Sequence, residues 1–158
     1  MAMSQLTKPD NIAAVHFGKA WIYLCLALLV HVIDETANDF LSVYNPFVKS
    51  IRAFIPFLPV PTFSFPVWLG GLLAAVVLLL SLSPFAFHEA RWVKPLAYFL
   101  GIVMIINGLL HFAGSWYLNR LMPGFISSPL LIACSIYLLV TLRKVYNKAK
   151  NIHVQIDI

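Results

Sequence analysis

Four long apolar runs constrain this chain more than any other feature, because a helix needs about 20 mostly apolar residues to cross a bilayer. The runs cover about 17–39, 65–84, 94–117 and 124–145. Of the 158 residues, 61% are hydrophobic and 11% charged, and a soluble domain of this length cannot bury so much apolar surface. The sequence excludes a soluble enzyme. It predicts an all-α polytopic membrane protein, a four-transmembrane-helix bundle in which residues 1–158 form a single membrane domain.

The segment 43–64, between the first two runs, has a different character. Lys49 and Arg52 interrupt it. Three prolines forbid a long helix: Pro56, Pro59 and Pro61. We expect a short interfacial helix near 45–55 followed by an extended stretch. In the preferred interpretation this segment caps the bundle, and in the alternative it forms a lid.

The distribution of Lys and Arg predicts how the spans are oriented, because cytoplasmic loops carry more of them. Three lie on the side of the 43–64 segment: Lys49, Arg52 and Arg120. Eight lie on the side of both termini and the 85–93 loop: Lys8, Lys19, Arg91, Lys94, Arg143, Lys144, Lys148 and Lys150. We therefore expect both termini in the cytoplasm. The net charge of +5 fits anchoring to the lipid bilayer, and we expect no nucleic-acid partner.

The first apolar run ends in polar residues that are costly at membrane depth. It reads His31-Val-Ile-Asp34-Glu35, and Asn38 follows. Each ionisable group there costs on the order of 2.5–3.5 kcal/mol. Offsets of three and four residues place these side chains on one helical face. Such a group is a candidate functional site.

The third run carries a second polar stripe. Asn107, His111 and Ser115 are spaced four residues apart, so they lie along one face of that helix. Under the expected topology, this stripe and the one on the first run sit near the same, non-cytoplasmic end of the membrane. Two such stripes at one depth can face each other across the bundle core.

The combined inventory of imidazoles and carboxylates suits a divalent metal. We expect His31, Glu35 and His111 to bind zinc, iron or manganese. Asp34 or Asn107 would be a fourth ligand or would orient an imidazole. The same groups also suit metal-free proton transfer. A third interpretation is structural, in which interhelical hydrogen bonds and ion pairs hold the bundle together.

Polar and aromatic residues outside this cluster carry less specific signals. Arg120 is expected to pair with Asp39, with an anionic substrate group as the alternative. Glu89 and its neighbour His88 are expected to form a solvated ion pair with Arg91. Hydroxyls in such helices usually bond back to the backbone, and we expect this of Ser115, Ser127 and Ser128. Four tryptophans near span ends fit an aromatic belt: Trp21, Trp68, Trp92 and Trp116.

Two blocks of sequence resemble the HXXEE family of small bacterial membrane proteins. The first is His31-Val-Ile-Asp34-Glu35, and the second is Asn107-Gly-Leu-Leu-His111 followed by Met122-Pro123-Gly124-Phe125-Ile126-Ser127. The chain departs from the motif at Asp34, where the motif has Glu; the shorter side chain argues against direct ligation there. The resemblance covers the order of the blocks over about 30–142. It implies a compact helical fold in a bacterial membrane, here the inner membrane, and points to His31, Glu35 and His111 without implying a reaction.

Three functions remain open from the sequence. The first is a metal-dependent enzyme, by default a hydrolase, acting on a lipid or other apolar substrate; its catalytic residues would be His31, Asp34, Glu35, Asn107 and His111. The second is a metal-free acid–base isomerase or cyclase of an isoprenoid or sterol-like lipid. The third is a non-enzymatic carrier or accessory subunit. A bundle this small often pairs with itself, so a homo-oligomer is also expected.

Overall fold

The computed structural model describes residues 8–57 and 59–156, and in these ranges the chain forms helices and no strand. Six helices follow one another: α1 Lys8–Ala37, α2 Leu41–Phe54, α3 Phe65–Ser81, α4 Ser83–Phe87, α5 Val93–Leu118 and α6 Ser128–Ile156. The prediction of an all-α fold is confirmed.

Four helical stretches are long and apolar enough to cross a membrane: Ile12–Ala37, Phe65–Phe87, Val93–Leu118 and Ser128–Asn147. They match the four predicted spans, with corrections at three ends. The first begins at Ile12, about five residues before the predicted start near 17. The second continues past Pro84 because this proline stands in the first turn of α4, where its missing N–H is not needed. The fourth begins at Ser128 rather than at 124, because Gly124 has a positive φ of +86° that a helix does not allow.

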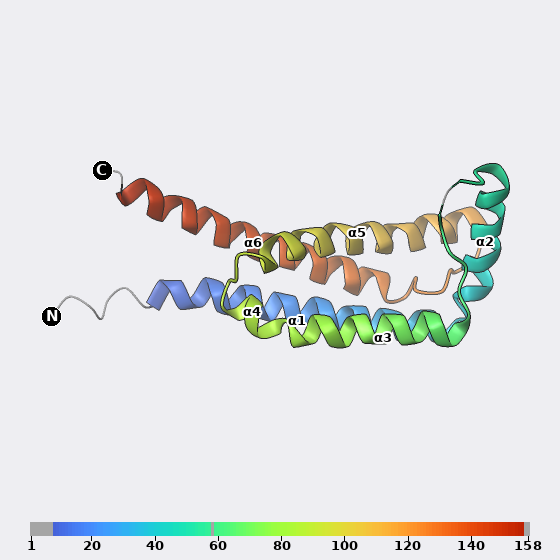
Figure 1. Cartoon of the computed structure of the whole chain (residues 1–158), viewed down its shortest axis with the longest axis horizontal. Coiled ribbons are helices and arrows are strands. Elements are labelled where there is room, and N and C mark those ends of the chain that lie inside the picture. Colours follow the sequence, from blue (N-terminus) through green and yellow to red (C-terminus); the bar gives the residue numbers. More distant parts are fainter. Residues whose placement is uncertain (1–7, 58, 157–158) are drawn as a thin grey trace.

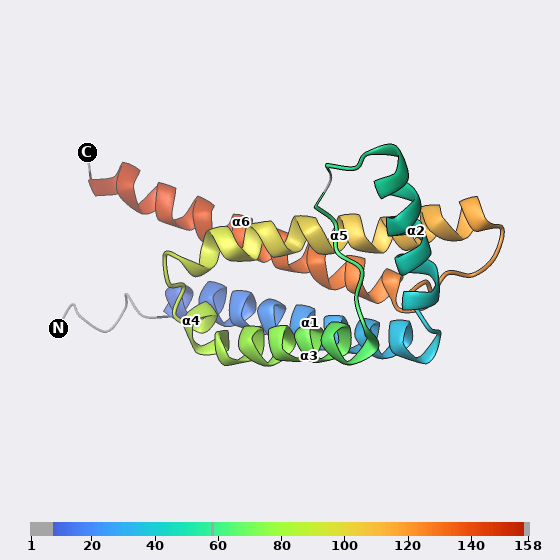
Figure 2. The same ribbon diagram turned by 45° about the vertical axis from the view of Figure 1, so that its right-hand side comes forward.

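The four spans run side by side, and the described ends of α1 and α6 lie at the same end of the bundle (Figure 1). Helix α6 packs between α1 and α5, while α3 packs on α1. Helix α2 lies across the opposite end, close to the loop that joins α5 to α6 (Figure 2). The apolar side chains that face outward over the spans, such as Val77, Phe99, Ile106 and Leu110, suit contact with lipid tails.

The interior is built from apolar side chains and close helix approaches. Phe17, Leu131 and Leu138 are completely buried. Two glycines let α5 approach α6, since a Cβ at Gly101 would stand 2.7 Å from Leu139, and one at Gly108 would stand 2.7 Å from Ile132. Small residues at helix contacts are the usual basis of packing in membranes, where lipid competes with apolar side chains.

The prediction of an aromatic belt fits two of the four tryptophans. Trp92 and Trp116 are exposed, but Trp21 and Trp68 are buried. The indole Nε1–H of Trp21 donates to the carbonyl oxygen of Leu79 at 2.8 Å. This bond ties α1 to α3 and gives the buried indole the polar partner that it needs.

The segment after α1 caps one end of the bundle. Helix α2 begins at Leu41, four residues before the predicted start near 45, and ends as expected. The Asn45 side chain donates to the carbonyl of Phe63 at 2.9 Å and accepts from its N–H at 3.0 Å. The Tyr44 hydroxyl donates to the carbonyl of Pro61 at 3.1 Å. These hydrogen bonds come from side chains of α2 and hold the Pro-rich stretch against that helix, so the stretch needs no β-strand pairing.

Candidate metal centre

The two polar stripes meet in the core near the α2 end of the bundle. His31 and Glu35 lie one turn apart on α1, and His111 faces them from α5. All three are buried, at 2%, 5% and 3% exposure. His31 Nε2 stands 3.1 Å from His111 Nε2, and Glu35 Oε1 stands 3.6 Å from the first nitrogen and 3.3 Å from the second. The predicted convergence of the stripes is confirmed.

These three atoms form a triangle of the size that a metal ion requires. In a tetrahedral zinc site with bonds of about 2.0–2.1 Å, neighbouring ligand atoms stand roughly 3.3–3.4 Å apart. The observed sides of 3.1, 3.3 and 3.6 Å average to this value. A point equidistant from all three atoms lies about 1.9 Å from each in their plane, so an ion slightly above the plane would reach normal bond lengths. His31, Glu35 and His111 could therefore hold a metal ion.

A hydrogen-bonded relay fixes the tautomer of His31. Its Nδ1 lies 2.8 Å from the Ser127 hydroxyl, which lies 2.7 Å from Asp34 Oδ2. The single hydroxyl proton of Ser127 goes to the carboxylate, because a charged acceptor makes the stronger bond. Ser127 Oγ must then accept from Nδ1–H of His31. The Nε2 lone pair of His31 is left free, which is the state that a metal ligand needs.

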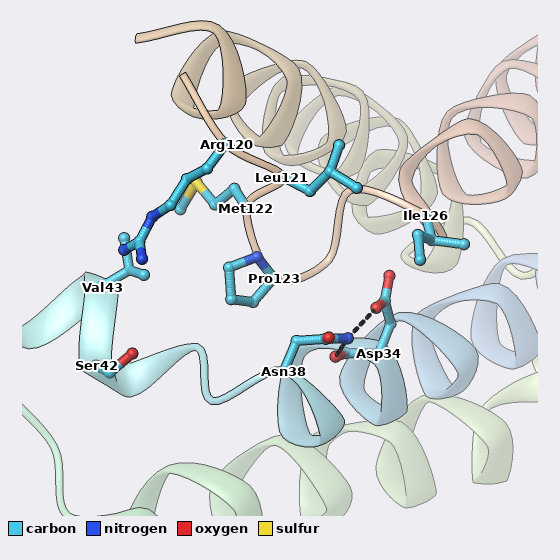
Figure 3. Close-up of a pocket in the computed structure, with 9 residues that line it drawn as sticks. All are labelled: Asp34, Asn38, Ser42, Val43, Arg120, Leu121, Met122, Pro123 and Ile126. Atoms are coloured by element: carbon cyan, nitrogen blue, oxygen red, sulfur yellow. Dashed lines mark hydrogen bonds between the residues drawn. The ribbon is translucent and has the colours of Figure 1, made fainter. Parts of the chain in front are cut away.

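Asp34 supports the centre and does not belong to the triangle. Its Oδ2 accepts from both the backbone N–H and the hydroxyl of Ser127, at 2.9 and 2.7 Å. Its Oδ1 accepts from the Asn38 amide at 2.8 Å (Figure 3). Three neutral donors therefore hold this carboxylate in place. Of the two roles predicted for Asp34, the geometry fits the orienting one.

Two buried atoms beside the triangle have no hydrogen-bond partner among the described residues: Asn107 Oδ1 and His111 Nδ1. Leaving a buried polar atom unpaired costs about 1–3 kcal/mol. Asn107 comes from the predicted stripe, one turn before His111 on α5. Its free oxygen is a candidate acceptor or ligand for a group bound in the centre.

Gly124 lets the loop between α5 and α6 lie against both imidazoles. A Cβ at this position would stand 2.6 Å from His111 Cε1 and 2.9 Å from His31 Cε1, so only glycine fits. Its positive φ is also a conformation that side chains disfavour. On another side, the Phe40 ring lies 5.9 Å from the ring of His111 and stacks at 5.8 Å on Trp68. Loop backbone and aromatic rings thus shield the centre.

Ser127, Gly124 and Phe40 belong to the centre, although no pattern in the sequence assigned them to it. Ser127 was expected to bond only to the backbone; it does contact the carbonyl of Gly124 at 3.2 Å, but its main partners are His31 and Asp34. Ser115 and Ser128 do bond back to the backbone, at 2.7 Å each. The Pro123-Gly124 turn was the one available signal, since it brings the start of α6 near the end of α5.

Two predicted ion pairs are wrong. Within the described residues Arg120 lies within 4.0 Å of no carboxylate, Asp39 included, because the turn at Asp39 and the loop that carries Arg120 hold them apart. Glu89 pairs with Lys94 at 3.8 Å in place of Arg91, since Glu89 takes a left-handed conformation with φ of 50° that turns the chain toward α5.

No family model, curated protein or solved structure matches the chain. The resemblance to the HXXEE family stays a prediction.

Proposed function

We propose that the protein is an intramembrane metal-dependent enzyme whose centre is formed by His31, Glu35 and His111. The observation that carries this proposal is the triangle of three buried ligand atoms with the dimensions of one face of a metal tetrahedron. Cis ligands of an octahedral ion with bonds near 2.1 Å stand about 3.0 Å apart, so the observed sides of 3.1 to 3.6 Å fit zinc, iron or manganese. Zinc, which catalytic sites hold with three protein ligands, is the ion to test first.

The residues around the triangle have separable roles in this proposal. The Asp34–Ser127 relay orients His31 and keeps its Nε2 unprotonated. Asn107 Oδ1 orients the substrate by accepting a hydrogen bond from it, and Glu35 carries a second carboxylate oxygen that can accept a proton. A bound metal supplies Lewis-acid activation of water or of a substrate oxygen, and hydrolysis of a lipid or other apolar substrate is the reaction class that this supports.

A second candidate function rests on the polar contacts that lead from Asp34 through Ser127 to His31, and on His111 Nε2, which faces both His31 Nε2 and Glu35 Oε1. Each neighbouring pair of heavy atoms lies between 2.7 and 3.3 Å. A proton on one of these nitrogens or on Glu35 can be delivered to a substrate without a metal, as acid–base isomerisation or cyclisation of an isoprenoid-like lipid requires. The two functions differ in their dependence on metal.

Elemental analysis of the detergent-purified protein separates them. Purification without chelator should give nearly one zinc per chain, lost in His31→Ala and in His111→Ala. His16→Ala is the matched control, because His16 is exposed toward the opposite end of α1 and its ring bonds to the hydroxyl of Tyr137, away from the centre. A wild-type protein without zinc, iron or manganese would overturn the metal proposal and leave the proton-transfer alternative.

A further inference from the structure

Two hollows adjoin each other at the end of the bundle that carries the metal centre. The smaller, of about 170 Å³, is polar and is lined by Asp34, Asn38 and Ser42 among others (Figure 3). The larger, an open groove of about 780 Å³, is lined mainly by aromatic and apolar side chains, including Phe112 and Trp116. Arg120 and Leu121 line both, so the polar hollow and the apolar groove lie on either side of the same two residues.

The cation between the two hollows is available to an anion. Arg120 is exposed, and no carboxylate of the described chain lies within 4.0 Å of it. In Figure 3 its guanidinium extends toward Val43 and away from Asp34. Asp34 is itself held by Ser127 and Asn38, so it does not neutralise Arg120.

The groove also lies at a fitting depth for a lipid. Trp116 and Tyr117, in the last turn of α5, are 90% and 86% exposed. Exposed Trp and Tyr at the end of a span mark the boundary between acyl chains and headgroups. At that level an apolar groove faces acyl chains while a neighbouring cation faces headgroups.

We infer that the two hollows bind one anionic phospholipid from the bilayer. Its acyl chain lies in the groove along Phe112 and Trp116, and its phosphate lies at Arg120, whose planar guanidinium binds phosphate through two hydrogen bonds. The phosphate then borders the polar hollow, whose wall at Asp34 is joined to His31 by two hydrogen bonds. The inference rests on the proposed function for its chemistry: the lipid is held beside the centre, and neither hollow is lined by His31, Glu35 or His111.

The test uses full-length, metal-free protein in a neutral detergent, with bound lipid counted by native mass spectrometry. The probes are dioctanoyl phosphatidic acid, dioctanoyl phosphatidylcholine and inorganic phosphate. We expect saturable binding of one phosphatidic acid, at least tenfold tighter than phosphatidylcholine and unaffected by inorganic phosphate. Arg120→Gln should weaken it about tenfold. Lys49 is an exposed cation on α2 that lines neither hollow, so Lys49→Gln should keep the affinity for phosphatidic acid within twofold of wild type.

Several outcomes overturn the inference. Equal affinity for the two lipids removes the role of charge, and inorganic phosphate that binds as tightly as phosphatidic acid removes the role of the groove. An equal loss in Arg120→Gln and Lys49→Gln shows only a general effect of charge. Because the protein is metal-free in this assay, a failed zinc measurement leaves the result intact. In turn, Arg120→Gln should keep its zinc, which separates failure at the groove from failure at the centre.

Discussion

Replacing Gly124 by alanine should destroy metal binding while the bundle stays folded. The added Cβ would stand 2.6 Å from His111 Cε1, 2.8 Å from His111 Nδ1 and 2.9 Å from His31 Cε1. Ordinary carbon contacts begin near 3.4 Å, so the two rings must move apart from the loop by about 0.5–0.8 Å. Both imidazoles contribute a nitrogen to the metal triangle, so one substitution displaces two ligands at once.

The size of the effect follows from how strictly a metal fixes its ligands. Metal–ligand distances in proteins hold to within about 0.2 Å, which is less than half of the required movement. Disturbing the orientation of ligands typically costs 10–100-fold in metal affinity, and we expect Gly124→Ala to lose at least that much. The positive φ adds a conformational cost of about 1–2 kcal/mol for alanine, a loss of stability that a packed bundle can survive.

Zinc affinity measured by competition with a chromophoric chelator, together with circular dichroism and thermal unfolding, tests this reasoning. Gly71→Ala is the matched control, because beyond the adjacent backbone of its own helix the added Cβ would meet no described atom within 4 Å. It should bind zinc as the wild type does. The reasoning is refuted if folded Gly124→Ala binds zinc within twofold of wild type, or if Gly71→Ala loses zinc equally.

Two further predictions test the relay and the cap. Ser127→Ala removes the acceptor for Nδ1–H of His31 and should weaken zinc binding about tenfold. The Ser128 hydroxyl donates to the Gly124 carbonyl, so Ser128→Ala should leave zinc binding unchanged. Equal losses in the two variants contradict the relay. Asn45→Ala removes both hydrogen bonds to Phe63 and should speed hydrogen exchange of the Phe63 amide about tenfold by mass spectrometry, without changing zinc content; unchanged exchange contradicts the fastening of the Pro-rich stretch.

The spans could be predicted from the sequence because the bilayer imposes a length and a composition on each helix separately. The polar stripes could be predicted for a similar reason, since His31 and Glu35, or Asn107 and His111, share a face through the period of one helix. The prediction that the two stripes meet depended on their shared depth in the membrane. No knowledge of the loops was needed for that step, and the confirmed contact between His31 and His111 depends on it.

The parts that the sequence did not indicate depend on the path of the chain between helices. Ser127 reaches Asp34 because the turn at Gly124 brings the start of α6 back over α1, and no periodicity encodes that path. Trp21 is buried because α3 packs onto α1, a tertiary contact that its position near a span end does not predict. Both cases concern the partner that a residue meets across the bundle.

The unpaired atoms of the centre argue against a purely structural role for the polar cluster. If the cluster existed to hold α1 and α5 together, its polar atoms would be paired within the protein, because each unpaired one costs about 1–3 kcal/mol. Asp34 and Ser127 meet that expectation, since their polar atoms are paired. His111 Nδ1 and Asn107 Oδ1 do not, as neither finds a partner in the described part of the chain. A group bound in the centre could pair with Asn107 Oδ1, whereas His111 Nδ1 faces the Gly124 loop, across its ring from the Nε2 of the triangle. Asn107 Oδ1 is therefore the atom whose missing partner is expected of a site that a bound group completes.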